Sequence, residues 1–137
     1  MTDIALFTVY IMVKLAAYIA WCYVGIVWFA PERKPVLKSA VLFGVGRLFL
    51  GIFLGIGIFL AALSMNNATR NAPLTYLVIY VPVRFGEWLL WYYLLRGEKR
   101  VARPVTWIAG GVIVSCLADV PLGILEGGVV PVGRPFC

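Results

Sequence analysis

Residues 39–63 read SAVLFGVGRLFLGIFLGIGIFLAAL, an apolar stretch whose one charged residue is Arg47. A helix rises about 1.5 Å per residue, so this stretch is long enough to cross the roughly 30 Å hydrocarbon core of a bilayer. Three more stretches of similar length and character lie at about 4–29, 74–95 and 105–125. We predict an all-α, polytopic integral membrane protein in which residues 1–137 form a single membrane domain, an antiparallel bundle of four transmembrane helices.

The composition of the whole chain agrees with a lipid environment. Of its 137 residues, 63% are hydrophobic and 13% are charged, whereas soluble domains carry about 25% charged residues. The net charge of +6 comes from basic residues in short connections between the apolar stretches, and the positive-inside rule explains their placement. We therefore expect membrane lipids, and no nucleic acid, among the partners of this protein.

The distribution of basic residues predicts an orientation. The first and third connections carry seven of them: Arg33, Lys34, Lys38, Arg96, Lys99, Arg100 and Arg103. The opposite side carries two, Arg70 and Arg134. Because Lys and Arg are retained on the cytoplasmic side, both termini are expected to be non-cytoplasmic, in the cytoplasmic (inner) membrane of a prokaryote. The Gly- and Pro-rich tail 126–137 is expected to fold back over the outer end of the bundle.

The sequence contains no histidine and no closely paired cysteines, which narrows its chemistry. Without histidine, haem ligation through imidazole and His-based catalysis are excluded within this chain. The three cysteines, Cys22, Cys116 and Cys137, form no CxxC pair, so we expect no metal site and no cofactor. The terminal thiol of Cys137 could crosslink two copies, which leaves a homo-oligomer open.

Five ionisable residues fall inside the apolar stretches: Lys14, Arg47, Arg84, Glu87 and Asp119. Each costs on the order of 2.5–3.5 kcal/mol at the centre of a membrane helix, so all five are expected to face the bundle interior. Counting residues from the helix ends places Arg47 and Glu87 at the same depth, about 14 Å from the basic face, where they can meet. Lys14 and Arg84 lie about 15 Å from the other face, and Asp119 is within reach of either.

Small residues follow one side of the second stretch. Ala40, Gly44, Gly51 and Gly55 form a stripe with Arg47 at spacings of three and four residues. Gly51 and Gly55 make a GxxxG step, a pattern at which membrane helices approach closely. The stripe therefore predicts that Arg47 lies on a helix-packing face.

Proline and aromatic residues add three expectations. Pro82 lacks an N–H, so we expect the third helix to kink just before the charged pair Arg84 and Glu87. Tyr10 and Tyr18 share a helix face with Lys14 and offer it cation–π contact. An interfacial aromatic belt is expected from residues near the cytoplasmic ends: Trp28, Trp88, Trp91, Tyr92, Tyr93 and Trp107.

The five internal charges do not balance. Three cations face two carboxylates, which leaves one surplus positive charge. Either Lys14 is neutral, or an anion such as a phosphate or carboxylate completes the site. The structural alternative is that ion pairs hold the helices together, Arg47 with Glu87, and Lys14 or Arg84 with Asp119.

Three functions are compatible with this pattern. In the first, the protein binds or translocates an anionic amphiphile, lipid-like or phosphate-bearing, and its ligand-binding residues are Lys14, Arg47, Arg84, Tyr18, Tyr80 and Trp91. In the second, it is an integral membrane enzyme of lipid or isoprenoid metabolism in which Glu87 or Asp119 acts as general acid or base. In the third, it is a non-catalytic subunit of a membrane complex.

Overall fold

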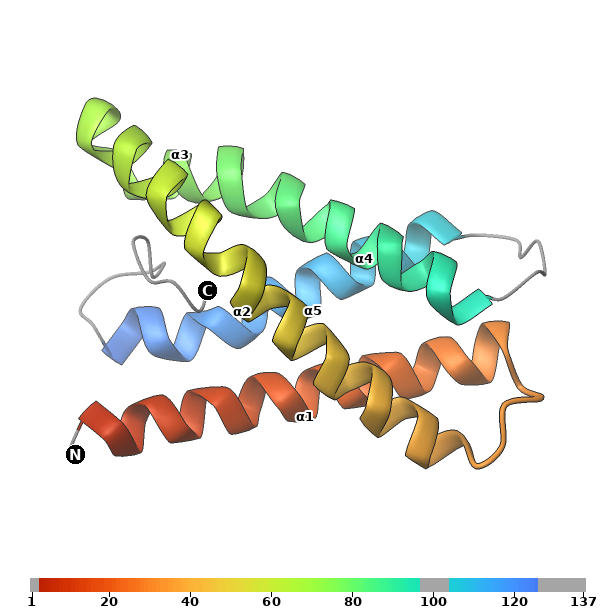
Figure 1. Cartoon of the computed structure of the whole chain (residues 1–137). Helices are drawn as coiled ribbons and strands as arrows, with labels where there is room; N and C mark the ends of the chain where they lie inside the picture. Colours follow the sequence, from red (N-terminus) through yellow and green to blue (C-terminus); the bar gives the residue numbers. More distant parts are fainter. Residues whose placement is uncertain (1–2, 97–103, 126–137) are drawn as a thin grey trace.

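The computed structural model describes residues 3–96 and 104–125, and all of its regular structure is helical. The elements are α1 (Asp3–Phe29), α2 (Val36–Thr69), α3 (Ala72–Thr75), the π-helix η1 (Tyr76–Tyr80), α4 (Val81–Arg96) and α5 (Pro104–Leu125). Because α3, η1 and α4 follow one another without a break, they form one rod, and the described chain is an all-α bundle of four helices (Figure 1). The predicted tail 126–137 lies outside the described residues.

The helix ends have local causes in the sequence. Pro35 stands just before α2, and its carbonyl accepts a hydrogen bond from the Ser39 N–H at 3.2 Å. α2 ends at Thr69 because Arg70 adopts a left-handed backbone conformation with φ of 52°. The side chain of Asn71 accepts a hydrogen bond from the Leu74 N–H at 3.1 Å and so caps the next helix. α2 therefore runs from Val36 to Thr69, past both ends of the predicted 39–63.

Three helices are long and apolar enough to cross a membrane: Phe7–Phe29 in α1, Val36–Met65 in α2 and Pro104–Pro121 in α5. The rod of α3, η1 and α4 is the fourth helix, and it carries the irregular η1 turn. These spans indicate a membrane protein with several crossings. The identity of the membrane and the side that the termini face stay predictions.

Successive helices run in opposite directions, and α2 lies diagonally across the others (Figure 1). α1 packs against α2 and α5, and α4 packs against α5. α1 and α2 approach each other closely at Gly44, where an added Cβ would lie 2.9 Å from the Cα atom of Ile19. The close approach therefore occurs at the first glycine of the predicted stripe. Near the GxxxG step, a Cβ on Gly51 would meet the Arg47 side chain instead, at 3.3 Å from Nη1.

Indole rings fill the core between α1, α4 and α5. Each of three rings lies against a glycine of another helix: Trp107 at Gly25, Trp21 at Gly110 and Trp88 at Gly111. A Cβ at any of these glycines would come within 2.7 Å of the ring. The indole N–H groups are satisfied as well, for example by the Trp21 Nε1 donating to the Trp107 carbonyl at 3.1 Å. The small residues thus create hollows that large aromatic side chains occupy.

This packing corrects the predicted interfacial belt. Trp28 and Tyr93 are 58% and 52% exposed, as belt residues are. Trp88, Trp91, Tyr92 and Trp107 are instead buried between helices. The prediction was wrong for these four because it considered their position along the helix axis and not their partners on other helices, which are glycines for the three tryptophans and Phe29 for Tyr92.

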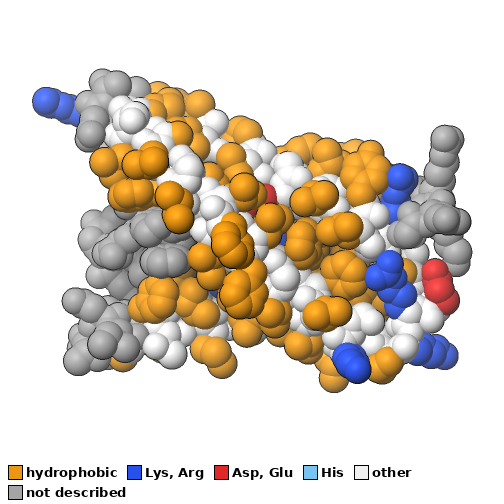
Figure 2. All heavy atoms as spheres, viewed as in Figure 1, with side chains coloured by type: hydrophobic (Ala, Val, Ile, Leu, Met, Phe, Trp, Pro, Cys, Tyr) orange, Lys and Arg blue, Asp and Glu red, His pale blue; other side chains and the backbone are white. Residues whose placement is uncertain are grey.

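The outer surface matches a lipid environment. Figure 2 shows a face on which hydrophobic side chains cover the length of the helices, while most Lys and Arg side chains gather at the end that carries the α1–α2 connection. Phe53, on α2, is 76% exposed. In a bilayer, such side chains contact acyl chains rather than water.

Candidate functional site

The five charges predicted to face inward are all buried. The exposed fraction is between 1% and 6% for Lys14, Arg47, Arg84, Glu87 and Asp119. They come from all four helices and form two groups, one around Asp119 and one between α2 and α4. The predicted inward orientation is confirmed.

Asp119 is the centre of the first group. Its Oδ1 lies 2.8 Å from the Lys14 Nζ and accepts a hydrogen bond from the Tyr10 hydroxyl at 3.0 Å. Its Oδ2 pairs with the Arg84 guanidinium and accepts a hydrogen bond from the Tyr76 hydroxyl at 2.8 Å. Each carboxylate oxygen thus has two donors, and the single carboxylate holds two cations. The ammonium of Lys14 also lies 4.7 Å from the Tyr10 ring centre, as the cation–π prediction required.

The π-helical turn places Tyr76 beside Asp119. Pro82 cannot donate a backbone hydrogen bond, and just before it the Val81 N–H donates to the Tyr76 carbonyl, five residues back. Where the kink was expected, the structure has a single π-helical turn directly before Pro82, a form often found at functional sites. Tyr80 stacks on Tyr76 with ring centres 5.1 Å apart.

Arg47 and Glu87 form the second group, an ion pair between α2 and α4. The guanidinium of Arg47 also lies 5.0 Å from the Tyr18 ring centre and 5.3 Å from that of Trp88. Within the described residues, Glu87 has no other charged or hydrogen-bonding partner. The pairing expected from equal depth along two antiparallel helices is confirmed.

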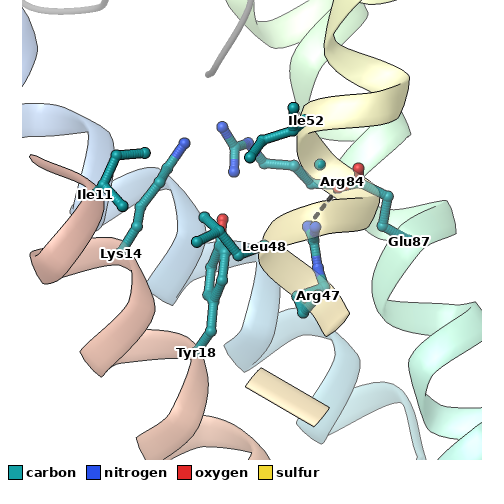
Figure 3. A pocket seen from close by; sticks show the side chains of 9 residues that line it. Ile11, Lys14, Tyr18, Arg47, Leu48, Ile52, Arg84 and Glu87 are labelled. Atoms are coloured by element: carbon teal, nitrogen blue, oxygen red, sulfur yellow. Dashed lines mark hydrogen bonds and ion pairs between the residues drawn. The ribbon is translucent and has the colours of Figure 1, made fainter. Parts of the chain in front are cut away.

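A pocket lies between the two groups (Figure 3). It is lined by the charged and polar residues Lys14, Tyr18, Arg47, Arg84 and Glu87, and by Ile11, Leu48, Gly51 and Ile52. In Figure 3 the Lys14 and Arg84 side chains point toward each other, and the Tyr18 hydroxyl points into the space between them. The cavity volume is about 10 Å³, close to the minimum that holds one water molecule.

The side chains around this pocket have unused hydrogen-bond donors. The Nε atoms of Arg47 and Arg84 are buried without a partner among the described residues. The Tyr18 hydroxyl points into the same pocket, and the hydrogen bonds seen in the described part of the chain do not include it. Buried donors without acceptors are rare in native proteins. Together with the surplus cation, they make the pocket a place where an oxygen acceptor would be stabilised.

Two of the predicted ligand-binding residues lie away from the pocket lining. Trp91 is buried beside α2, and its indole N–H donates to the Phe43 carbonyl at 3.0 Å. Tyr80 packs on Tyr76 in η1. Both side chains support helix packing in this structure.

Sequence reasoning missed Tyr76, whose hydroxyl completes the Asp119 group. The signal was present in the sequence, because Tyr76, Tyr80 and Arg84 follow at intervals of four residues on one helix face. Tyr10 was noted only as a ring beside Lys14, whereas its hydroxyl also contacts Asp119. A tyrosine ring predicts packing equally well, so the polar role of these hydroxyls depends on the position of Asp119 on another helix.

Among residues 3–96 and 104–125, no group of three His, Cys, Asp or Glu side chains could hold a metal ion. Comparison of the chain with models of protein families, with curated protein sequences and with solved structures found no match.

Proposed function

We propose that this protein binds an anionic ligand through a carboxylate or phosphate group in the pocket between α1, α2 and α4, and holds or translocates that ligand within the membrane. The observation that carries the proposal is the excess of positive charge and hydrogen-bond donors around the pocket. Lys14, Arg47 and Arg84 face two carboxylates. An anionic oxygen supplies both the missing charge and the missing acceptor.

The size of the cavity defines how such a ligand binds. A volume of about 10 Å³ admits one oxygen atom in the position of a water molecule. The rest of the ligand then lies at the mouth, against Ile11 and Ile52. A larger headgroup enters only if α1 and α2 move apart.

The enzyme alternative rests on Glu87. Both oxygens of Asp119 are occupied by two donors each, which leaves that carboxylate no room to accept a substrate proton. Glu87 lines the pocket and has Arg47 as its one partner in the described chain. Of the two carboxylates, Glu87 is therefore the one that can meet a bound ligand as an acid or base.

The test uses Tyr18→Phe, which removes only a hydroxyl without a partner in the described protein. We expect the purified protein in mild detergent to bind oleate or dioleoyl phosphatidate, measured by native mass spectrometry. A hydrogen bond to a charged group contributes about 1.5–3 kcal/mol, so Tyr18→Phe should weaken binding by about tenfold or more. Its thermal stability should equal that of the parent protein.

The matched control is Tyr23→Phe, an exposed tyrosine on the same helix. It should bind both anions as the parent does. Binding of the uncharged oleyl alcohol at the same level, or equal binding by Tyr18→Phe and the parent, would show that the pocket is not an anion site. Co-purification of another polypeptide in the absence of any anion binding would favour the subunit function.

A further inference from the structure

The pocket lies on the side of the α1–α2 contact where these two helices separate. The contact point is Gly44 against Ile19. On α1 the lining residues precede Ile19, and on α2 they follow Gly44: Ile11, Lys14, Tyr18, Arg47, Leu48, Gly51 and Ile52. The helices are antiparallel, so these two sets lie on the same side of the contact. Figure 1 shows α2 leaning away from α1 in this direction.

Two half-buried residues of the pocket lining, Ile11 and Ile52, lie within the candidate spans Phe7–Phe29 and Val36–Met65. We refer to these two residues as the rim of the pocket. The view in Figure 2 is across the helices, and it shows a few acidic atoms in the middle of an otherwise apolar face. Polar atoms therefore reach the lateral surface of the bundle at membrane depth, where a soluble ion has no direct path.

The surface next to the rim suits an acyl chain. Phe49, Phe53 and Ile56 on α2 are exposed, and each lies within about one helical turn of a pocket residue, Leu48 or Ile52. A chain attached to a headgroup in the pocket would lie over these side chains and bury apolar surface. An aqueous anion gains nothing from them.

The charge of the site selects the headgroup. With Lys14, Arg47, Arg84, Glu87 and Asp119 in their ordinary charge states, the site carries one net positive charge. One negative charge neutralises it, whereas a dianion leaves a net negative charge at a depth where an uncompensated charge is costly.

We propose, on the basis of the proposed anion-binding function, that the ligand is a membrane-dissolved amphiphile with a singly charged carboxylate or phosphodiester headgroup, and that it reaches the pocket laterally from the bilayer between α1 and α2. Tyr18 and the two arginines receive the headgroup oxygen. The apolar chain stays outside the bundle, on the exposed face of α2.

The experiment uses the full chain in phosphatidylcholine nanodiscs, with oleate as the lipid probe and acetate as the soluble probe of the same carboxylate chemistry. Ile52→Trp narrows the rim, and Leu42→Trp places the same side chain at an exposed position of α2 on the other side of the Gly44 contact. We expect oleate to bind, Ile52→Trp to weaken oleate binding by about tenfold, and Leu42→Trp to leave it unchanged. Acetate should compete only weakly, and oleyl phosphate in its dianionic form should bind less tightly than oleate.

The outcomes separate the two proposals. Lateral access would be overturned, and the anion site retained, if acetate bound as tightly as oleate and if its binding responded to Tyr18→Phe but not to Ile52→Trp. Tighter binding of dianionic oleyl phosphate than of oleate would overturn the single charge. If neither probe responds to Tyr18→Phe, the anion site itself is refuted. Equal thermal stability of Ile52→Trp and Leu42→Trp would show that the loss of oleate binding is a local effect.

Discussion

The pair of Arg47 and Glu87 joins α2 to α4 in the interior of the bundle, where water cannot screen either charge. Two aromatic rings, Tyr18 and Trp88, lie over the guanidinium. A charge in such surroundings depends on its partner, because its desolvation is compensated only while the pair exists. The stability effect of a substitution here is therefore governed by the charge left behind.

We predict that the stability losses caused by substitutions at Arg47 and Glu87 are not additive. Arg47→Met and Glu87→Met should each lower the free energy of unfolding by about 3–5 kcal/mol, because each leaves a buried charge unpaired. The double variant should lose less than either single one, since it buries no charge. The measurement is an SDS unfolding titration in mild detergent.

The control for this cycle is Lys38→Met, an exposed cation on the same helix, which should leave stability unchanged. A double variant whose loss equals the sum of the two single losses would mean that Arg47 and Glu87 do not depend on each other. In that case the ion pair would have no role in holding α2 against α4.

The helices pack according to where their glycines lie. Gly44 brings the backbones of α1 and α2 together at Ile19, and Gly25, Gly110 and Gly111 receive indole rings. Gly57 has no atom within 4 Å of the position of an added Cβ. The two glycines Gly44 and Gly57 of α2 therefore differ in their role in packing.

We predict that two glycine substitutions in α2 have different effects on stability. Gly44→Ala should destabilise the protein by about 1–3 kcal/mol, because its Cβ would lie 2.5 Å from the Ile19 Cγ1 and 2.9 Å from the Ile19 backbone. Gly57→Ala should be neutral or stabilising, since alanine is the better helix former. Thermal unfolding in mild detergent measures both. Equal effects of the two substitutions would place the α1–α2 contact elsewhere.

The whole molecule carries an asymmetry of charge between its two ends. Among the described basic residues outside the buried cluster, Arg33, Lys34, Lys38 and Arg96 lie at the end with the α1–α2 connection, and Arg70 lies at the other end. This asymmetry predicts the orientation of the protein in a membrane, because Lys and Arg resist translocation. The pocket's position relative to the two aqueous phases follows from that orientation.

We predict that the α1–α2 connection is cytoplasmic. Pro31 and Pro73 are exposed residues at opposite ends of α2. In a variant without the three native cysteines, Pro73→Cys should react with an impermeant maleimide in intact bacterial cells. Pro31→Cys should react only after the membrane is opened. The reverse pattern would invert the orientation, and equal labelling of both would indicate insertion in both directions.

The position of a residue along a helix could be read from the chain alone, because the rise per residue is nearly constant. Counting along two antiparallel stretches was enough to pair Arg47 with Glu87 and to bring Asp119 within reach of Lys14 and Arg84. The cost of charge in hydrocarbon required all of these side chains to face inward. Membrane character, four helices and the composition of the buried charged cluster follow from the same two rules.

Rotation about each helix axis and the distance between neighbouring helices depend on packing with side chains from other parts of the chain. The number of residues along a helix does not describe these contacts. They bury Trp88 and Trp107 against glycines of other helices and turn Trp91 toward Phe43. They also bring the Tyr76 hydroxyl to Asp119 through the η1 turn. The pocket, with Tyr18 pointing into it, exists only where α1, α2 and α4 meet, so no single segment of the sequence contains it.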